Sequence, residues 1–445
     1  MKLLRKKKED NPVLPDAEAF AEAQKDEKAQ ALEAVSPKPI AFDKKKPGKE
    51  ESYPENEYYL KIASRFKWAK YIAAALTVVF FLAMISIFRK DITLENFRYL
   101  LRDMNTDSTK YTNVYSTIYY DSVGDTDFAL FRDYLAVVRP GDTLLYSSEG
   151  KTVLSVTNDY LSPHVLSADS YFLVYDFGQN TQQFSVMNAF SKLYDGKTSA
   201  PISGAAISPN GLFAFILRNS DFRGVVEIYD SDFDVISRVY TDRYVTHIAF
   251  NDDGTRLLIV SLTDGGGNWV SEVSVVNPYN DESVFSVPVP GEMLISGAFT
   301  GNIVTVSGDG AVYHFDAEGN RLSFTGFEGK TPTGILSGNG KYAVSFNTTI
   351  LGTGKTVLCT DGNGVPFTVK VDGKVEAYAF TDSDLWIASG KTLYRFPYSG
   401  KDTVTYPIAE NCQRLLAFDN EKLMTCYPNY AEVVSFASGN GTETD

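Results

Sequence analysis

The chain has 445 residues, a formal net charge of −14 and three cysteines. More than 300 residues in one region are enough to bury a large core, so stability does not require disulfides. The acidity argues against nucleic-acid binding, which usually needs a basic surface, and we expect no nucleic-acid partner.

Residues 1–67 form a charged tail that we expect to be mostly disordered. The tail begins with a basic cluster from Lys2 to Lys8, which is either simply solvated or bound to anionic lipid. Residues 16–35 are rich in Ala, Glu, Gln and Lys and favour a short helix, although its apolar face is thin. Residues 36–54 have the Pro- and Lys-rich composition of a linker. The tail has no room for a catalytic domain.

Residues 68–104 contain an apolar run that predicts a transmembrane helix, followed by a short stalk. Tyr71 to Phe88 holds no charged residue. At about 1.5 Å per residue it reaches roughly 27 Å, which is enough to cross a bilayer core. A buried helix would be amphipathic, and a cleaved signal peptide would have its apolar core much nearer the N-terminus. We therefore expect a single-pass signal-anchor in the lipid bilayer of the cell membrane.

The charge on the two sides of this run predicts its orientation. Each side carries four Lys or Arg within about 15 residues, so the nearest charges do not decide. Residues 1–70 carry 16 Lys and Arg against 13 Asp and Glu, whereas the remainder carries 26 against 43. Positive segments stay in the cytoplasm, and a long domain crosses whatever its charge. We place the N-terminus in the cytoplasm and the remainder outside the cell membrane.

Residues 105–438 are short strands rich in Val, Ile, Phe, Tyr and Thr, and they contain a motif that occurs eight times. In each copy an apolar pair closes one strand, a polar turn follows, and a second apolar strand begins. The copies recur every 36 to 49 residues or so. The pairs are Ala129-Leu130, Val165-Leu166, Ala206-Ile207, Ala249-Phe250, Ala298-Phe299, Ile335-Leu336, Ala379-Phe380 and Ala417-Phe418.

Each copy also has room for two further strands. We expect a third strand to end at aromatic-Asp steps such as Tyr175-Asp176, Tyr229-Asp230 and Phe315-Asp316, and a fourth to follow. Four short antiparallel strands in about 40 residues are typical of a β-propeller blade. A single sheet cannot cover both of its faces, but a ring of blades can.

We therefore expect an all-β fold, an eight-bladed β-propeller. Seven blades would result if one of the two weak early copies is not a blade. The last copy has room for only three strands before the polar tail at 439–445. We expect Tyr111 to Tyr119 to supply its missing outer strand, which would close the ring and leave no open edge.

Two stretches, ISPNGLFAF at 207–215 and VYHFDAEGNRLSF at 312–324, resemble the strand-turn-strand units of WD40-like and quinoprotein-like propellers. The whole plan, over roughly residues 60–440, is similar to a Gram-positive bacterial family of membrane-anchored β-propellers of unknown function. The resemblance implies fold and setting, and no activity. Only Trp269 and Trp386 lie in the propeller, so the regular tryptophan of quinone-binding blades is missing. We expect no quinone and no other cofactor.

Two motifs with the look of ligand-binding loops fail on spacing. GTGKT at 352–356 has Thr349 where a phosphate-binding loop needs its first glycine, and it joins two strands. Asp230, Asp232 and Asp234 alternate as in a calcium loop, but Val235 stands where that loop needs glycine. We interpret these aspartates as turn formers.

The histidines and cysteines give no metal site or catalytic centre. The histidines lie in three different repeats with no shared spacing: His164, His247 and His314. The cysteines are Cys359, Cys412 and Cys426. Their odd number leaves at least one thiol free or paired between chains. In the hairpin near the C-terminus Cys426 should face about Leu415, which disfavours a disulfide with Cys412.

The candidate binding residues are Asp264, Asn268 and Trp269. Three glycines follow Asp264, which predicts the most mobile loop of the propeller, and Trp269 next to it is a candidate contact for a partner. The alternative is a loop tip beside an ordinary strand aromatic.

The function that we expect is a non-catalytic interaction, scaffold or sensing module outside the membrane. Its protein partner and oligomeric state are not identified by the sequence. The alternative is an extracytoplasmic enzyme, a quinoprotein or a lyase or hydrolase of cell-wall sugar, which would need a titratable cluster in the central channel.

Overall fold

The computed structural model describes residues 57–87, 117–121, 125–219, 221–338, 341–347, 355–360, 366–399, 403–420, 422–436 and 442–443. The chain divides into two compact units, Met1–Thr93 and Leu94–Asp445. The predicted short helix at 16–35, the basic cluster and the stalk lie outside the described residues.

The described part of the first unit is one helix, α2 (Glu57–Ile87). Its sequence is rich in Ala, Leu and Lys, which favour helix, and contains no Gly or Pro. It includes the predicted apolar run as far as Ile87, and Phe88 lies outside the described residues. The large apolar side chains of Ile72, Leu76 and Leu82 are exposed on it. Among the described residues no helix combines the length and the apolarity needed to cross a membrane. The predicted span stays a prediction.

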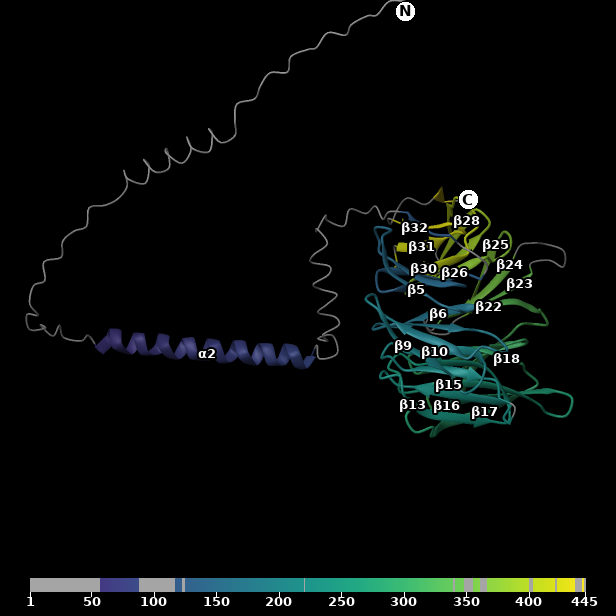
Figure 1. Ribbon diagram of the computed structural model, residues 1–445, viewed down its shortest axis with the longest axis horizontal. Coiled ribbons are helices and arrows are strands. Elements are labelled where there is room, and N and C mark those ends of the chain that lie inside the picture. The colour runs from purple at the N-terminus through teal and green to yellow at the C-terminus, as the bar shows by residue number, and fades with distance from the viewer. Residues whose placement is uncertain are drawn as a thin grey trace, which may run out of the picture. The chain divides into compact units, whose positions relative to one another are not determined.

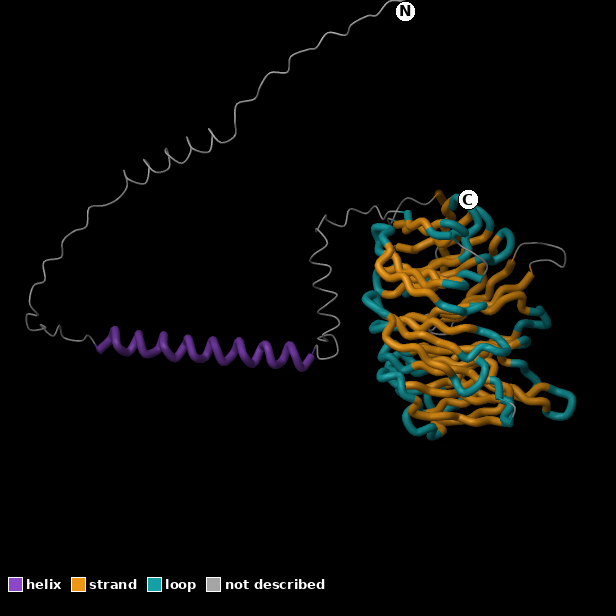
Figure 2. Tube along the Cα trace, in the orientation of Figure 1, coloured by secondary structure: helices purple, strands orange, loops and turns teal. Residues whose placement is uncertain are grey.

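The second unit is an eight-bladed β-propeller, which confirms the predicted fold class and the larger of the two blade counts. Its strands form eight sheets. Six sheets each contain four strands that are consecutive in the sequence. In a seventh sheet three consecutive strands pair with one strand from earlier in the chain. The remaining sheet has a fifth strand at its outer edge. Figure 1 shows the sheets of this unit packed one against the next, and Figure 2 shows strands joined by loops throughout it.

The first four blades each contain four strands in sequence order. Blade 1 contains β2 (Asp127–Phe131), β3 (Tyr134–Arg139), β4 (Asp142–Tyr146) and β5 (Thr152–Thr157). Blade 2 contains β6 (Pro163–Ser167), β7 (Phe172–Asp176), β8 (Gln183–Met187) and β9 (Lys192–Lys197). Blade 3 contains β10 (Ile202–Ile207), β11 (Phe213–Leu217), β12 (Gly224–Tyr229) and β13 (Val235–Thr241). Blade 4 contains β14 (Tyr244–Phe250), β15 (Leu257–Asp264), β16 (Trp269–Val276) and β17 (Ser283–Pro290).

The last four blades continue the pattern and close it. Blade 5 contains β18 (Leu294–Thr300), β19 (Ile303–Gly308), β20 (Ala311–Phe315) and β21 (Arg321–Gly326). Blade 6 contains β22 (Pro332–Gly338), β23 (Lys341–Asn347), β24 (Lys355–Thr360) and β25 (Pro366–Val371). Blade 7 contains β26 (Ala377–Phe380), β27 (Asp384–Ser389), β28 (Thr392–Pro397), β29 (Val404–Pro407) and β33 (Thr442–Glu443). Blade 8 contains β30 (Arg414–Ala417), β31 (Lys422–Cys426), β32 (Tyr430–Ser435) and β1 (Ile118–Tyr119).

The first strand of each blade lies innermost. These strands contact one another around the ring from β2 to β30, and β30 contacts β2 again. The predicted apolar pairs lie at or near the ends of these innermost strands. They end the strand in blades 3, 4 and 7, the strand continues one or two residues beyond them in blades 1, 2, 5 and 6, and the pair reaches one residue past the strand in blade 8. The predicted third strand was wrong in blade 2, because Tyr175 and Asp176 end the second strand, β7.

The direction of the strands defines two faces of the ring. We call the face at which the innermost strands begin the top face and the opposite one the bottom face. Consecutive strands are antiparallel, so each blade runs down, up, down and up. The connections between blades and the turns between second and third strands therefore lie on the top face. The other two turns of each blade lie on the bottom face.

The burial of each strand follows from its place in its blade. The second strand β11 and the third strand β12 of blade 3 are buried at every position, because blades cover both sides of them. Their sequences, FAFIL and GVVEIY, are accordingly apolar apart from Glu227, which pairs with Arg238 (2.7 Å), whereas a half-exposed strand would alternate. The outer strand β9 is exposed at nearly every position and carries two Lys and one Asp.

The core consists of eight apolar clusters, one for each contact between neighbouring blades. In the cluster between blades 1 and 2, for example, Phe131 lies 5.3 Å from Phe172 between ring centroids. The cluster between blades 8 and 1 contains Ile118, Phe128 and Met424. No blade therefore leaves an apolar face uncovered.

The ring closes as predicted, through a strand that precedes the first blade. Ile118 pairs with Ala431 and Tyr119 with Tyr430, so β1 is the outer strand of blade 8. Strand formation is described for these two residues of the predicted segment, and its first six residues lie outside the described part. In Figure 1 the blue strands of blade 1 lie beside the yellow strands of blade 8, in agreement with the contact between β2 and β30.

Candidate functional site on the top face

The predicted binding loop is the top-face turn between β15 and β16 in blade 4. The Asp264 carboxylate accepts hydrogen bonds from the N–H groups of Gly266 (3.0 Å) and Gly267 (2.9 Å). These two bonds hold the pKa of the exposed Asp264 carboxyl below its usual value. Gly266 and Gly267 have φ of 87° and 109°, a region that favours glycine. Asp264 thus shapes the turn, because its carboxylate is engaged in hydrogen bonds with the backbone of the turn.

The structure places Trp269 and Asn268 where a partner can reach them. Asn268 is exposed, and its carbonyl oxygen accepts a hydrogen bond from the N–H of Gly265 (2.8 Å). Trp269 begins β16, opposite Asp264, and its side chain is 49% exposed. The three predicted residues therefore lie in one turn, in which Asp264 holds the backbone and Trp269 is exposed; a contact of Trp269 with a partner stays a prediction.

Other aromatic side chains are exposed on the neighbouring part of the top face. Phe222 and Tyr240 of blade 3 pack against each other, with ring centroids 4.9 Å apart. The Arg223 guanidinium lies 5.3 Å from the ring centroid of Tyr244, at the start of blade 4. Exposed aromatics beside arginine are typical of protein-binding surfaces. This group was not predicted, because its members come from two separate connections, the turn between β11 and β12 and the link from β13 to β14.

A carboxylate and an imidazole lie close together at the top-face end of the central channel. Asp127 begins the innermost strand β2, and His164 lies in the next innermost strand, β6. The His164 Nδ1 is 3.4 Å from the Asp127 Oδ2. The Asp127 carboxylate also accepts hydrogen bonds from the N–H groups of Phe128 (2.9 Å) and Val165 (3.1 Å). One carboxylate therefore ties blade 1 to blade 2 and orients an imidazole.

Charge and burial act in opposite directions on this carboxyl. Burial of Asp127 raises its pKa, but His164, the charge of Arg414 and the N–H groups of Val165 and Phe128 lower it, and the net pKa is below the usual value. Asp127 is therefore a fixed negative charge at the mouth of the channel.

The ring of His164 is held on two sides by aromatic side chains. It stacks on Tyr175 with centroids 5.6 Å apart and meets the edge of Phe177 at 5.5 Å. Its side chain is half-exposed, so the imidazole is both positioned and accessible. Among the described residues no three His, Cys, Asp or Glu side chains are grouped to hold a metal ion. The arrangement suits hydrogen bonding to a ligand.

A polar groove lies farther out, between the end of blade 1 and the two outer strands of blade 2. It has a volume of about 490 Å³, and its lining includes Asp159, Tyr160, Ser185, Lys192 and Asp195. Burial raises the pKa of Tyr160 to about 12, so its phenol is protonated and donates to the Ser185 Oγ at 2.6 Å. Ser185 donates to Asp195 (2.7 Å), which pairs with Lys192 (2.6 Å). These bonds fix one wall of the groove.

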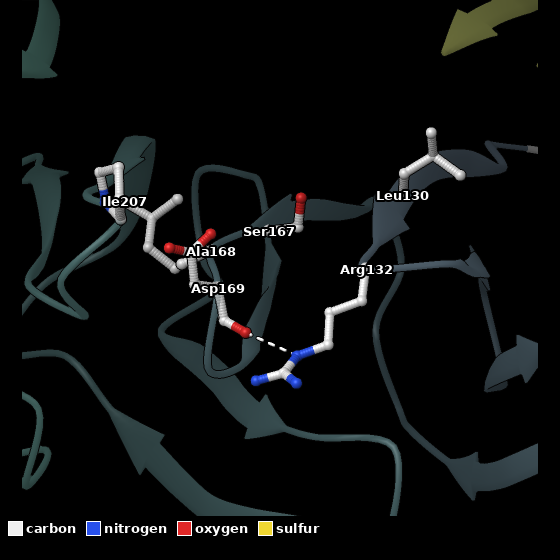
Figure 3. A pocket seen from close by; sticks show the side chains of 7 residues that line it. Leu130, Arg132, Ser167, Ala168, Asp169 and Ile207 are labelled. Atoms are coloured by element: carbon white, nitrogen blue, oxygen red, sulfur yellow. Dashed lines mark hydrogen bonds between the residues drawn. The ribbon is translucent and has the colours of Figure 1, made fainter. Parts of the chain in front are cut away.

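A cavity of about 520 Å³ opens at the bottom face instead, between the turns of blades 1, 2 and 3 (Figure 3). Its lining includes Leu130, Ile207 and Pro209. The Arg132 Nε donates a hydrogen bond to the carbonyl oxygen of Asp169 (2.9 Å), from the turn of blade 1 to that of blade 2. We interpret Arg132 as a residue that links two neighbouring blades, because similar hydrogen bonds recur between other neighbouring turns.

The remaining sequence candidates have structural roles. His247 and His314 lie in blades 4 and 5, away from His164, and burial lowers the pKa of each. The Asp230 Oδ1 accepts hydrogen bonds from the N–H groups of Asp232 (3.0 Å) and Asp234 (2.9 Å), as expected of a turn. Of GTGKT, Lys355 and Thr356 begin β24 and the glycines lie outside the described residues.

All three cysteines are free and buried. Cys426 pairs with Arg414 and not with Leu415, so the predicted register was wrong by one residue. The Cys412 Sγ instead donates to the backbone, with the Arg414 carbonyl oxygen at 3.0 Å. The pKa of each thiol is raised by burial, which keeps it protonated and unreactive.

Comparison with known proteins agrees with the fold. The model of DUF5711, a family of unknown function, matches residues 105–436. No curated protein matches the chain. BamB from Moraxella catarrhalis is similar in structure, with a TM-score of 0.52, 12% identity, and coverage of 73% of this chain and 99% of BamB. Sqt1 from Chaetomium thermophilum, bound to the N-terminus of the ribosomal protein L10, gives 0.51, 14%, 72% and 100%. At these identities the likeness shows the fold alone.

The Asp127 carboxylate should stabilise the propeller in a pH-dependent way. We expect Asp127→Asn to lower the free energy of unfolding at pH 7 by about 1–3 kcal/mol, because two N–H groups lose a charged acceptor. The folded pKa of Asp127 lies below the unfolded value of about 3.9. Its contribution is therefore full above that pH and is lost as the pH falls through the folded pKa.

Urea unfolding of the full chain at a series of pH values measures this difference. The exposed neighbour Asp125 provides the matched control, and Asp125→Asn should leave the free energy of unfolding nearly unchanged. Equal losses in the two variants, or a loss in Asp127→Asn that does not shrink in acid, would contradict the assignment.

Proposed function

We propose that this chain, which belongs to the DUF5711 family of unknown function, is a non-catalytic interaction module anchored in a membrane. Its propeller binds a protein partner through the top face. Large apolar side chains are also exposed on outer strands and bottom-face turns, among them Leu193, Tyr279 and Leu322. The observation that carries the proposal is the top-face group of exposed apolar side chains, most of which are aromatic. They are Tyr119, Leu161, Phe177, Phe222, Tyr240, Tyr244, Trp269 and Ile295.

Burial elsewhere in the ring gives these side chains their significance. Inner strands and blade interfaces bury their apolar residues, so exposure at the top face does not reflect poor packing. Exposed apolar patches rimmed by polar groups mark protein-binding sites on soluble surfaces. Tyr and Trp in particular dominate binding energy at interfaces. The related Sqt1 propeller was solved with a bound ribosomal protein segment, so the architecture is compatible with binding a polypeptide.

The membrane anchor is the second part of the proposal. It rests on Tyr71 to Phe88, eighteen residues without a charge, and on the exposed apolar side chains along α2. The excess of basic residues before this run and of acidic residues after it supports a cytoplasmic N-terminus and a propeller outside the membrane. The resemblance to membrane-anchored propellers supports a Gram-positive bacterial setting.

The closing strand β1 begins at the bottom face. β1 runs antiparallel to β32, from the bottom face to the top face. Thr117, just before β1, lies beside Gly150 in a bottom-face turn of blade 1.

An enzyme is the alternative, and the oriented imidazole of His164 is the observation that favours it. His164 could act as a general base through its second ring nitrogen. In the described part of the chain His164 makes no hydrogen bond to a serine, threonine or cysteine side chain, and the pKa of its partner Asp127 is lowered, so these contacts assign neither a nucleophile nor a general acid. The aromatic contacts and Asp127 position the ring equally well for binding.

Charge placed inside the apolar run should release the protein from membranes. We expect the wild type to stay with the membrane fraction after an alkaline carbonate wash and the double variant Leu76→Arg, Phe80→Arg to be released. Each arginine costs about 2.5–3.5 kcal/mol at the centre of a bilayer. Glu57→Arg, at the start of α2, is the control and should remain bound. Retention of the double variant would count against the anchor.

Cysteine labelling of the same protein tests the proposed orientation in the membrane. Its native thiols are buried, so an added exposed cysteine is the one that a membrane-impermeant maleimide labels. In intact cells we expect labelling of Glu149→Cys in the propeller and no labelling of Lys8→Cys in the tail. The reverse pattern would overturn the proposed orientation.

Photo-cross-linking tests the interaction itself. We expect benzoylphenylalanine at Trp269 or Leu161, on the top face, to give a discrete protein adduct in membranes. The matched control is Tyr279, which is 55% exposed at a bottom-face turn and should give none. The absence of an adduct from every position would contradict the function, whereas an adduct from Tyr279 alone would move it to the other face.

A further inference from the structure

We propose that the top face between blades 1 and 2 binds an extended polypeptide segment in which a basic side chain adjoins an apolar one. This inference rests on the proposed function and specifies its site. We call the surface the seam site and define it by Asp125, Asp159, Leu161, His164 and Phe177. These residues come from the connections into blades 1 and 2 and from the top-face turn of blade 2.

The apolar part of the seam site is exposed, and hydrogen bonds hold the backbone that carries it. Leu161 is 76% exposed and Phe177 is 39% exposed. The buried Asp176 carboxylate accepts hydrogen bonds from the N–H groups of Leu161 (3.1 Å) and Ser162 (2.8 Å). The N–H of Phe177 donates to the Ser162 carbonyl oxygen at 2.9 Å. The backbone that presents both side chains is therefore fixed, which lowers the entropy cost of binding.

The acidic part of the seam site adjoins the apolar part. The Asp125 Oδ2 accepts a hydrogen bond from the Ser162 Oγ (3.4 Å), and Asp159 lies two residues before Leu161. Both carboxylates are exposed. Within the described residues neither has a Lys, Arg or His within ion-pair distance. A Lys or Arg of the partner would complement these charges.

The groove between the blades continues the seam site away from the channel. Asp159 belongs to both, so a segment that contacts Leu161 and Asp159 leads directly into the groove. The groove wall is polar and is fixed by the chain of hydrogen bonds from Tyr160 to Lys192. A fixed polar wall suits the N–H and C=O groups of an extended main chain, which must keep hydrogen bonds when they leave water.

The same residues disfavour other kinds of partner. Asp125, Asp127 and Asp159 together repel phosphate groups, which counts against a nucleic acid or an anionic lipid surface. The exposed Leu161 and Phe177 offer apolar contact rather than further hydrogen bonds. A polypeptide that carries both a basic and an apolar side chain satisfies the two parts at once.

Selection from random peptides tests this directly. A display library of short random peptides would be selected against the full chain in lipid nanodiscs, and the recovered peptides synthesised for fluorescence anisotropy. We expect enrichment of Lys or Arg next to Leu, Phe or Trp. Asp125→Asn with Asp159→Asn should weaken binding roughly threefold to tenfold, as two exposed ion pairs allow. Added salt should weaken it further.

Variants of the apolar part and of the bottom face complete the test. Leu161→Ser should weaken the same peptides, whereas Tyr279→Ser should leave their affinity unchanged. All these side chains are exposed, so circular dichroism should show intact folding. The inference is overturned if no peptide is enriched, if acidic peptides are recovered, or if the seam variants bind like the wild type. If photo-cross-linking still yields a top-face adduct in that case, the proposed function stands and the seam site alone falls.

Discussion

The need to cover both faces of every sheet determines this structure. Each blade is a sheet of four strands, or five in blade 7, with apolar side chains on both sides, and the only cover available is the next blade. The last blade has three strands of its own, so one strand must come from elsewhere. Ile118, 1% exposed in β1, supplies that strand and enters the cluster that joins blade 8 to blade 1. The first strand of the propeller in the sequence, β1, is thus the outer strand of the last blade, and it closes the ring.

In a closed ring the turns, and not the buried strands, are available to other molecules. The turns of the two faces make different kinds of hydrogen bond. The bottom-face turns fasten neighbouring blades by hydrogen bonds from a side chain to a backbone carbonyl. These bonds run from Arg132 to Asp169, from Asn210 to Asp253 and from Lys341 to Thr381. The top-face connections use two carboxylates, the partly buried Asp127 and the buried Asp176, to hold backbone N–H groups. In doing so they present His164, Leu161 and Phe177 outward, which is why binding is proposed there.

Periodicity predicted the fold well and the site poorly, for a physical reason. The apolar pairs repeat because every innermost strand has the same environment, so eight blades and the closing strand follow from the pattern. Trp269 was found because its glycine-rich turn is local. Asp127 and His164 lie 37 positions apart, and only the packing of blade 1 on blade 2 brings them together. Their sole sequence signal is a titratable residue just before each of the first two apolar pairs. The one-residue error at Cys426 reflects a turn length that composition does not fix.

The closing strand offers the most direct test of this account, because its two residues face opposite environments. Ile118 is buried and Tyr119 is 74% exposed, although they are neighbours on β1. Thermal and urea unfolding of the full chain would compare Ile118→Ala with Tyr119→Ala. The account predicts that Ile118→Ala lowers the free energy of unfolding by about 2–5 kcal/mol and that Tyr119→Ala has little effect. Equal stability of Ile118→Ala and the wild type would show that the ring does not depend on this strand.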